Sequence, residues 1–451
     1  MFFSIVSFIC SLAIACSLAE IASIYPTAGG QYHWVAALAP PRQRIIASWL
    51  TGWISVGGQV VLTASAAFVA GLQFQALITL NHPESYVPER WQGMLFYWFI
   101  LLYSGAVNIW GSRILPHTNL ASGKSALIFE RAWNRLTFIG ILHIAGVVVI
   151  IVVLSAMAPK HTAHFVFAEV TNTSGWSPTG VSWLVGILST VYPFLGYDAA
   201  CHLAEELPRP ARNVPIAMVG SVIANGALGL GCCIVLLFSL GNLNDLLASP
   251  TGFPFMQLFL NATKNNVGAT ILILPVSLIA VAANAAGCTS TSRTYWALAR
   301  DNGTPFPKYF SHVHAKLQVP VRAVAALTVV EMLLGLIYLG NSTAFNAILS
   351  MSILGMYTSY LLPIAYMAIY GRKKLSSGEY GPFRMGKWGT YTNMIAIAWL
   401  MLAIVFSTFP SVRPVTPQNM NYSVVVMGGW LAFGVTFFVL FGKRHYKGPV
   451  V

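Results

Sequence analysis

The chain has 451 residues, of which 56% are hydrophobic and only 8% are charged. A soluble domain carries about a quarter charged residues, so this composition excludes an ordinary soluble protein. Lysine and arginine number 25 against 12 acidic residues, which gives a formal net charge of +13. Such an excess is found in proteins that bind nucleic acid, in proteins on acidic membrane surfaces, and in the loops of membrane proteins. The positions of the charges along the chain distinguish these classes.

Eleven apolar stretches approach or exceed the roughly 20 residues that a helix needs to cross a bilayer core. They lie at 2–25, 46–79, 91–112, 136–157, 181–206, 215–241, 267–299, 321–340, 344–370, 390–409 and 421–442. No long polar linker separates them, and the six cysteines lie inside them without a CxxC pattern, as small buried hydrophobic residues do. We therefore predict an all-α polytopic membrane protein with one domain over 1–451 and a short cytoplasmic tail at 443–451.

The basic residues follow the alternation of the loops. If the loop after the first span is cytoplasmic, 21 basic residues fall on the cytoplasmic side, and the other side keeps only Arg90, Lys160, Lys264 and Arg413. Cytoplasmic loops of membrane proteins carry such an excess, and one miscounted helix would invert every later loop. The charge therefore indicates orientation in a lipid bilayer, and no nucleic-acid partner is needed to explain it.

Three stretches resemble fungal permeases of the amino acid, polyamine and organocation transporter superfamily. The run from Ser17 to Trp34, which contains Gly29-Gly30-Gln31-Tyr32, resembles the second helix of that family and the loop that follows it. Residues 192–206 resemble its sixth helix, and residues 292–306 resemble the end of its eighth. The first motif is closest in form to members described as choline or amino acid permeases.

The resemblance implies twelve helices, of which the first ten form two inverted five-helix repeats, as in leucine-transporter-type folds. The first and sixth helices of such folds are broken at the bilayer midplane, where their free backbone groups hold the substrate. This chain begins at the second helix, so we expect the fold without helix one and with half of that site removed.

The segment 118–140 is a second departure from the family. Residues 124–140 are interpreted as an unspliced insert or, alternatively, as an amphipathic cytoplasmic loop. Gly123-Lys124-Ser125 is not a nucleotide-binding motif, because Thr118 stands where that motif needs a glycine.

Asp198 is one of three acidic residues away from the ends of the predicted spans, the others being Glu20 and Glu331, whereas Glu205 and Glu206 stand at the very end of theirs. An ionisable group at that depth costs roughly 2.5–3.5 kcal/mol on insertion scales and so points to a function. Pro193 and Gly196 precede it and predict an unwound segment between two half-helices. Alternatively, Asp198 caps the second half-helix, and the two interpretations are compatible.

The unwound segment supplies most of the predicted substrate site. Its carbonyl groups and aromatic faces, together with the carboxylate, suit an organic ammonium group. The residues concerned are Phe194, Leu195, Gly196, Tyr197 and Asp198.

Two amide side chains in other spans are further candidates to bind substrate. Gln59 follows Gly57-Gly58, where we predict a break in the helix over 46–79, and Asn284 lies among small residues. Hydrogen bonding between closely packed helices explains both at least as well.

A row of titratable residues follows Asp198. His202 and the pair Glu205 and Glu206 recur at three- and four-residue spacing and so share one helical face, which could conduct protons. In the alternative, the two glutamates form a cytoplasmic gate with Arg293 and Arg300.

Glu20 is grouped with these gating and proton-coupling candidates, although we expect it to pair with the backbone or with an arginine of the next loop. No metal site is predicted, because the Asp-x3-His-x2-Glu spacing lacks a second histidine or a thiolate.

These features predict a secondary active transporter for amino acids or related small amines, such as choline or 4-aminobutyrate, that works by alternating access. The resemblance implies proton symport. We expect an organic cation or zwitterion and protons as partners, no cofactor, and a location in the plasma membrane or, alternatively, the vacuolar membrane. A nutrient sensor that does not transport, or an inactive truncated permease, is the alternative. No enzyme is predicted, because the Gly-x-Ser-x-Gly and clustered-histidine motifs are absent from the sequence.

Overall fold

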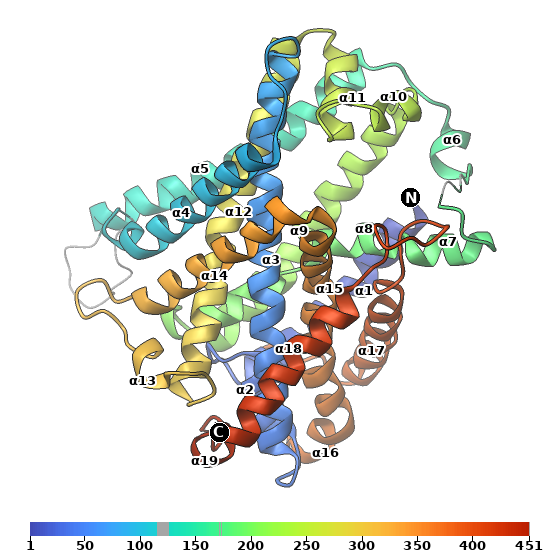
Figure 1. Ribbon diagram of the computed structural model, residues 1–451. Helices are drawn as coiled ribbons and strands as arrows, with labels where there is room; N and C mark the ends of the chain where they lie inside the picture. Colours follow the sequence, from blue (N-terminus) through green and yellow to red (C-terminus); the bar gives the residue numbers. More distant parts are fainter. Residues whose placement is uncertain (115–125, 171, 173, 451) are drawn as a thin grey trace.

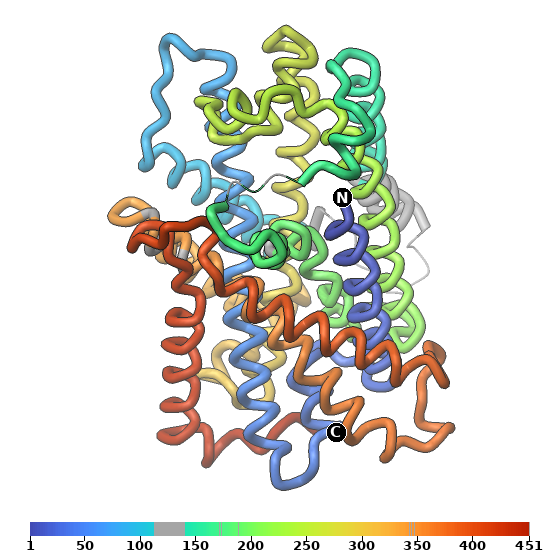
Figure 2. Tube along the Cα trace, turned by 90° about the vertical axis from the view of Figure 1, so that its right-hand side faces the viewer, coloured from blue at the N-terminus to red at the C-terminus, as the bar shows by residue number. Residues whose placement is uncertain are grey.

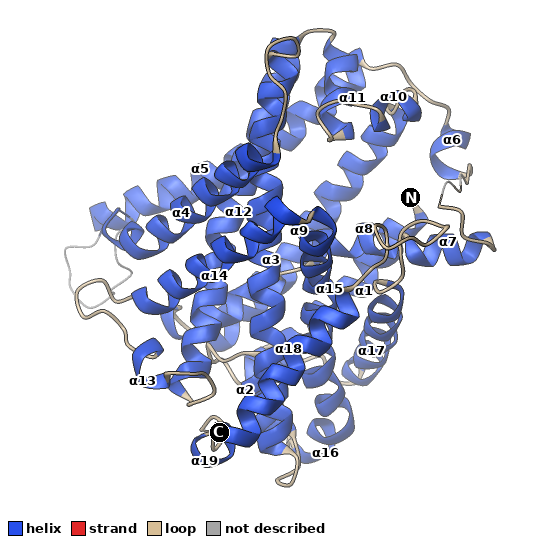
Figure 3. Cartoon of the chain, viewed as in Figure 1, coloured by secondary structure: helices blue, strands red, loops and turns tan. Residues whose placement is uncertain are grey.

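The computed structural model describes the backbone of residues 1–114, 126–170, 172 and 174–450, and the side chains of these residues outside 112–139 and except at 188, 342, 344 and 347. Within this part of the chain the structure consists of helices and loops, without a β-strand (Figure 3). Residues 118–125 of the predicted insert lie outside the described residues. The remainder of that segment belongs to a long helix that begins at Ala126.

Ten helical stretches of the described chain are long and apolar enough to cross a membrane, if the consecutive helical elements of 348–374 and of 423–445 are each counted as one stretch. They lie in or begin in α1 (Phe2–Ile24), α3 (Arg44–Asn81), α4 (Arg90–Ile114), α5 (Ala126–Met157), α9 (Pro210–Phe238), α12 (Asn266–Arg300), α14 (Val321–Gly340), α15 (Ser342–Tyr366), α17 (Trp388–Phe406) and α18 (Ser423–Phe437). Shorter elements lie between or after them: α2 (Gln31–Leu38), α6 (Ala163–Phe167), α10 (Leu243–Leu247), α11 (Pro254–Thr263), α13 (Pro307–Phe310), η3 (Met367–Gly371), α16 (Arg372–Lys374), η4 (Phe438–Gly442) and α19 (Lys443–His445).

The stretch predicted as a span at 181–206 is a broken element. It consists of α7 (Thr179–Val185), α8 (Ile187–Val191), η1 (Tyr192–Phe194) and η2 (Tyr197–Glu206), and its two parts meet at 43°. Gly196 has φ +88°, which glycine adopts without strain, and Leu195 before it is extended. The predicted unwound segment is therefore confirmed. The half after the break is a 3₁₀-helix, not an α-helix.

Several segments that the charge pattern assigns to one side of the membrane lie at the same end of the molecule. At one end Arg44 Nη2 donates to the Pro449 carbonyl (3.1 Å), and Lys374 Nζ donates to the Ala37 carbonyl (3.3 Å). Figure 1 shows α2, α13, α16 and the C-terminus at this lower end, with α10 and α11 at the opposite end. In Figure 2 the N-terminus lies well above the C-terminus. We call the end with the C-terminus the basic end.

Helix α3 runs through the centre of the bundle without the break predicted at Gly57-Gly58. The glycines serve close packing instead. A Cβ added at Gly58 would lie 2.9 Å from the backbone of Gly355 in α15, and one added at Gly355 would lie 2.7 Å from Gly58. The two helices cross so closely that their backbones touch, as small residues allow in membrane bundles. This contact fixes the register of α3 against α15, from which two parts of the site project.

Candidate functional site

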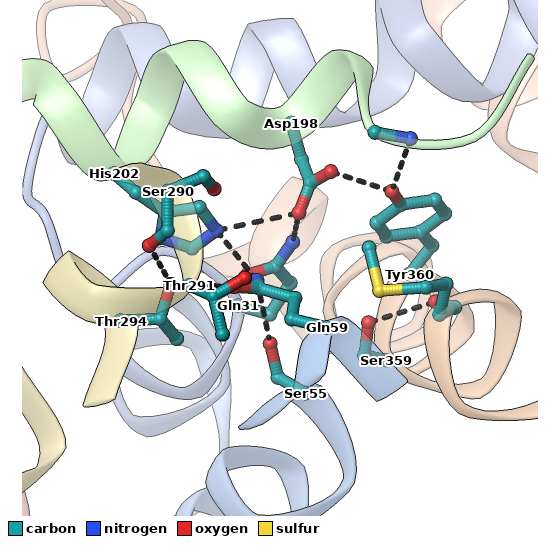
Figure 4. A network of polar contacts seen from close by, with 12 residues as sticks. Gln31, Ser55, Gln59, Asp198, His202, Ser290, Thr291, Thr294, Ser359 and Tyr360 are labelled. Carbon is teal, nitrogen blue, oxygen red and sulfur yellow. Dashed lines mark hydrogen bonds and ion pairs between the residues drawn. The ribbon is translucent and has the colours of Figure 1, made fainter. Parts of the chain in front are cut away.

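Asp198 is the centre of a buried polar network (Figure 4). Its side chain lies in the first turn of η2, is 1% exposed, and makes no capping bond to that helix. Tyr360 of α15 donates to Oδ1 (2.6 Å), and Gln31 Nε2 of α2 donates to Oδ2 (2.6 Å). The carboxylate is therefore held by side chains from distant elements, and the capping interpretation finds no support in this geometry.

His202 lies one turn after Asp198, and its Nε2 is 3.3 Å from Asp198 Oδ2. Its Nδ1 is 2.9 Å from the carbonyl oxygen of Ala28, so this nitrogen must carry the proton that the bond needs. Gly30, with φ +57°, gives the ring its space, because a Cβ there would lie 2.7 Å from His202 Cε1. Gly30 thus lets the loop before α2 pack directly against the histidine.

Gln59 joins α3 to this network. Its Nε2 is 3.0 Å from His202 Nε2 and 3.3 Å from the hydroxyl of Ser55, and its Oε1 accepts from Thr294 of α12 (2.9 Å). The structure thus places Gln59 beside His202.

Asn284, the other amide candidate, lies between helices instead. Its Nδ2 donates to the Thr63 carbonyl (2.8 Å), and Ser104 donates to its Oδ1 (2.7 Å). These bonds join α12 to α3 and α4, which is the alternative that the sequence left open.

The unwound segment contributes aromatic rings and free polar atoms. The Phe194 ring stacks on Phe8 at 5.9 Å, and the Tyr197 ring lies 5.2 Å from that of Tyr360. The Tyr197 hydroxyl and, from α2, Gln31 Oε1 are among the buried side-chain atoms of the described residues that have no hydrogen-bond partner. Buried polar atoms are rarely left unpaired, so these two are available to a ligand or to water.

Ion pairs lie at the basic end of the site. Arg293 Nε is 3.0 Å from Glu206 Oε1, and Arg300 Nη1 is 2.9 Å from Glu205 Oε2. These contacts are the ones that the sequence suggested for a gate, and they join α12 to η2. Beside them, Tyr32 donates to Asp301 (2.8 Å). Burial raises the pKa of the Asp301 carboxyl, although that hydrogen bond and the charge of Arg300 act in the opposite direction.

Glu20 lies apart from the Asp198 network. Arg372 Nη2 donates to its Oε2 (2.6 Å), and the Met385 backbone N–H donates to its Oε1 (2.9 Å). Pairing with arginine and with the backbone was expected, but the partner is not in the next loop. It follows α15, because the end of α1 packs beside the loop between α15 and α17.

Four side chains described above as part of the network were not anticipated: Gln31, Ser55, Thr294 and Tyr360. Gln31 belongs to the Gly-Gly-Gln-Tyr motif, so the motif itself was a usable signal. Thr294 and Tyr360 lie in predicted spans, and no motif or spacing in the sequence distinguishes their hydroxyl groups from others in those spans. Among the residues that the structure describes, no group of three or more His, Cys, Asp or Glu side chains is placed to hold a metal ion.

Comparison with known proteins shows the family to which the chain belongs. The family described as amino acid permease matches residues 1–430. The chain is 31% identical to a choline transporter of Saccharomyces cerevisiae, over 97% of this chain and 74% of that protein. It is 33% identical to a putative amino acid/polyamine transporter of Macrophomina phaseolina, over 92% of this chain and 87% of that protein. A solved structure of an Eremococcus coleocola manganese transporter has the same fold, with a TM-score of 0.55 at 12% identity, over 97% of this chain and 86% of that one.

Proposed function

We propose that this chain, which belongs to the amino acid permease family, is a secondary active transporter for a small organic cation or zwitterion. Its relatives are transporters and it has many apolar helices, so it is a multi-pass integral membrane protein of a transport family. Amino acids, choline and 4-aminobutyrate share one charged ammonium group on a small body. The proposal is that this group binds at Asp198.

The observation that carries this proposal is the way Asp198 is bonded. Its two close partners, Gln31 and Tyr360, are uncharged donors, and the third, His202, is charged only when protonated. With neutral His202 the carboxylate is a buried negative charge without a cation, which is costly unless a cation binds. An ammonium group beside it would balance that charge.

The surrounding atoms suit the same ligand. The unpaired Gln31 Oε1 and the Tyr197 hydroxyl can accept hydrogen bonds from N–H groups. The rings of Tyr197 and Tyr360 can attract a quaternary ammonium that has no N–H, by cation–π interaction worth about 0.5–2 kcal/mol. Primary amines and choline therefore both remain within the proposed substrate class.

For the mechanism we propose alternating access coupled to protons. His202 supplies a titratable group in contact with Asp198, which supports proton coupling. The pairs Arg293–Glu206 and Arg300–Glu205 join η2 to α12 at the basic end and would have to separate when the site opens there. The proposed location is the plasma membrane, with the basic end in the cytoplasm.

Uptake by the full chain tests this proposal. The tagged protein would be produced in cells with low background uptake, and labelled choline, 4-aminobutyrate and individual amino acids would be offered with and without a protonophore. We expect saturable uptake of at least one of them that the protonophore abolishes. Protein at the cell surface without uptake of any candidate would favour the sensor or the inactive permease.

Asp198→Asn tests the site itself. Loss of one partner of a buried charge costs about 3–5 kcal/mol, so uptake should fall by about 100-fold or more at equal surface level. Asp245→Asn is the matched control, because Asp245 lies exposed in α10. Uptake by the Asp198 variant equal to that of the control would refute the role of Asp198.

A further inference from the structure

We propose that Gln59 is a positioning residue that lets His202 gain and lose its proton, by turning one end or the other of its amide toward the imidazole. The amide N–H would face the neutral ring, and the amide oxygen would face the protonated ring. This inference rests on the proposed function, because it explains how a proton is accommodated at the Asp198 site.

The structure shows one of the two arrangements (Figure 4). The Ala28 carbonyl takes the proton of His202 Nδ1, so in the neutral ring Nε2 is an acceptor. Gln59 Nε2 lies 3.0 Å from it and donates, with Ser55 at 3.3 Å as the second acceptor of the amide. A protonated ring would place an N–H against this NH₂ group, which is a repulsive contact. The Gln59 contact as drawn therefore favours neutral His202, whereas the 3.3 Å contact between Nε2 and Asp198 Oδ2 favours the protonated ring.

The second arrangement is available because the residues around the amide can reverse their roles. A hydroxyl both donates and accepts, so Ser55 can donate to an amide oxygen turned toward it. Thr294 Oγ1 lies 2.9 Å from Gln59 Oε1 and 3.0 Å from the Ser290 carbonyl. After the turn it can accept from the amide and donate to Ser290. The number of hydrogen bonds made by Gln59 stays the same in both states.

The charges around His202 explain why the ring is the group that changes. Asp198 accepts from Gln31 and Tyr360 in both arrangements and stays a carboxylate. The other titratable group beside the ring is Cys201, its neighbour in η2. From α12 the cation Arg293 is bonded to Glu206, and α3 and the loop before α2 contribute only the uncharged Gln59 and the Ala28 carbonyl.

A glutamine suits this position better than either charged or apolar residues of its size. A glutamate offers acceptors only and would keep His202 protonated. A methionine has neither an N–H donor nor an amide oxygen. With methionine the neutral His202 ring would lose the donor to its Nε2, whereas the protonated ring would still donate to Asp198. Only the amide serves both forms, so Gln59 would set the pH range over which the site can exchange its proton.

The experiment compares the pH dependence of wild-type protein with that of Gln59→Glu and Gln59→Met. The midpoint of substrate uptake against pH should move to higher pH by about 1–3 units in Gln59→Glu, as expected for a new opposite charge in contact. Gln59→Met should move it in the same direction by less. Gln73→Glu is the matched control, since Gln73 lies 7% exposed on the same helix, about 21 Å further along. A midpoint equal to that of wild type in both Gln59 variants would overturn the proposal.

A second measurement separates this inference from the transport function. In purified full-length protein labelled with ¹⁵N-histidine, the His202 resonance would be identified by its loss in His202→Gln and titrated with pH. A titration midpoint that moves in Gln59→Glu supports the inference even if no candidate substrate is taken up, in which case the proposed function fails alone. Uptake with a raised KM and an unmoved His202 titration would show that Gln59 contacts substrate, and would overturn the inference while the function stands.

Discussion

The carboxylates at the basic end of the protein and the carboxylate in its interior are bonded to different kinds of partner. At the basic end, Glu206 and Glu205 meet guanidinium groups at 3.0 and 2.9 Å. In the interior, Asp198 meets an amide and a phenol, both at 2.6 Å. The outer carboxylates are thus balanced by arginines, partly in contact with solvent, whereas the inner one has two neutral donors and His202 at 3.3 Å, which balances its charge only when protonated. The difference teaches that, while His202 is neutral, the interior hydrogen bonds leave Asp198 with a negative charge, whereas the arginines at the basic end neutralise their glutamates.

Tyr360→Phe removes a donor from the inner carboxylate and should have the largest effect of the variants that compare these carboxylates. A hydrogen bond to a charged group contributes about 1.5–3 kcal/mol, which corresponds to a fall in uptake efficiency of roughly 10- to 150-fold. Uptake kinetics at matched surface levels would measure it. Tyr370→Phe is the control, because the Tyr370 ring stacks on Tyr366 away from the network. Equal kinetics for the two variants would show that the hydrogen bond from Tyr360 to Asp198 does not contribute to uptake.

Gly30→Ala tests the surroundings of Asp198 by displacing its third partner, His202. The glycine has φ +57° and ψ −127°, a conformation that alanine adopts at a cost of about 1–3 kcal/mol, and the added Cβ would meet the histidine ring. We expect uptake to fall several-fold and its pH dependence to change, because the ring must move from Gln59 and Asp198. Gly378→Ala provides the comparison, since a Cβ there meets nothing within 4 Å. A fall in uptake with an unchanged pH profile would mean that the turn, not the histidine, is what Gly30 supports.

The sequence predicted those parts of the fold and site that depend on local signals. The lengths of the apolar stretches located the spans, and Pro193 with Gly196 located the break. Proline lacks a backbone N–H and glycine tolerates a positive φ, and both effects act at the residue itself. Opposite charges at the same predicted end suggested the Arg293 and Arg300 pairings. The error at Gly57-Gly58 has the same origin: a glycine pair permits either a break or a close crossing, and only the presence of Gly355 opposite decides.

The partners of Asp198 could not be predicted, because no local signal specifies them. Tyr360 is 162 residues away in the chain and Gln31 is 167 residues away, and only the packing of α15 and α2 around η2 brings them together. Glu20 shows the same limit, since its arginine lies 352 residues further on. A single sequence gives the sign of a charge and its depth, whereas the identity of its partner depends on tertiary structure.

The buried and exposed cations of the basic end should differ when each is neutralised. The Arg293 side chain is 7% exposed and that of Arg300 is 39% exposed, although each meets one glutamate. Arg293→Gln should therefore lower the thermal unfolding temperature of the purified protein more than Arg300→Gln does, because solvent screens the second pair. Unfolding scans in the same detergent would compare the variants directly. Equal shifts would show that burial does not distinguish the two pairs.

Arg300→Gln should have the smallest effect, and salt should identify its origin. An exposed ion pair contributes at most about 1 kcal/mol, and added salt screens it, so the unfolding temperatures of variant and wild type should converge as salt is raised. The exchange variant Arg300→Glu with Glu205→Arg restores opposite charges in reversed order and should recover most of the loss at low salt. The cation–π contact of Arg300 with Trp296, at 4.8 Å, is lost in both variants and would not respond to the exchange. A loss that persists in the exchange variant would therefore assign the contribution of Arg300 to Trp296 or to Asp301, whose Oδ1 lies 3.8 Å from Arg300 Nε, and not to the pairing with Glu205.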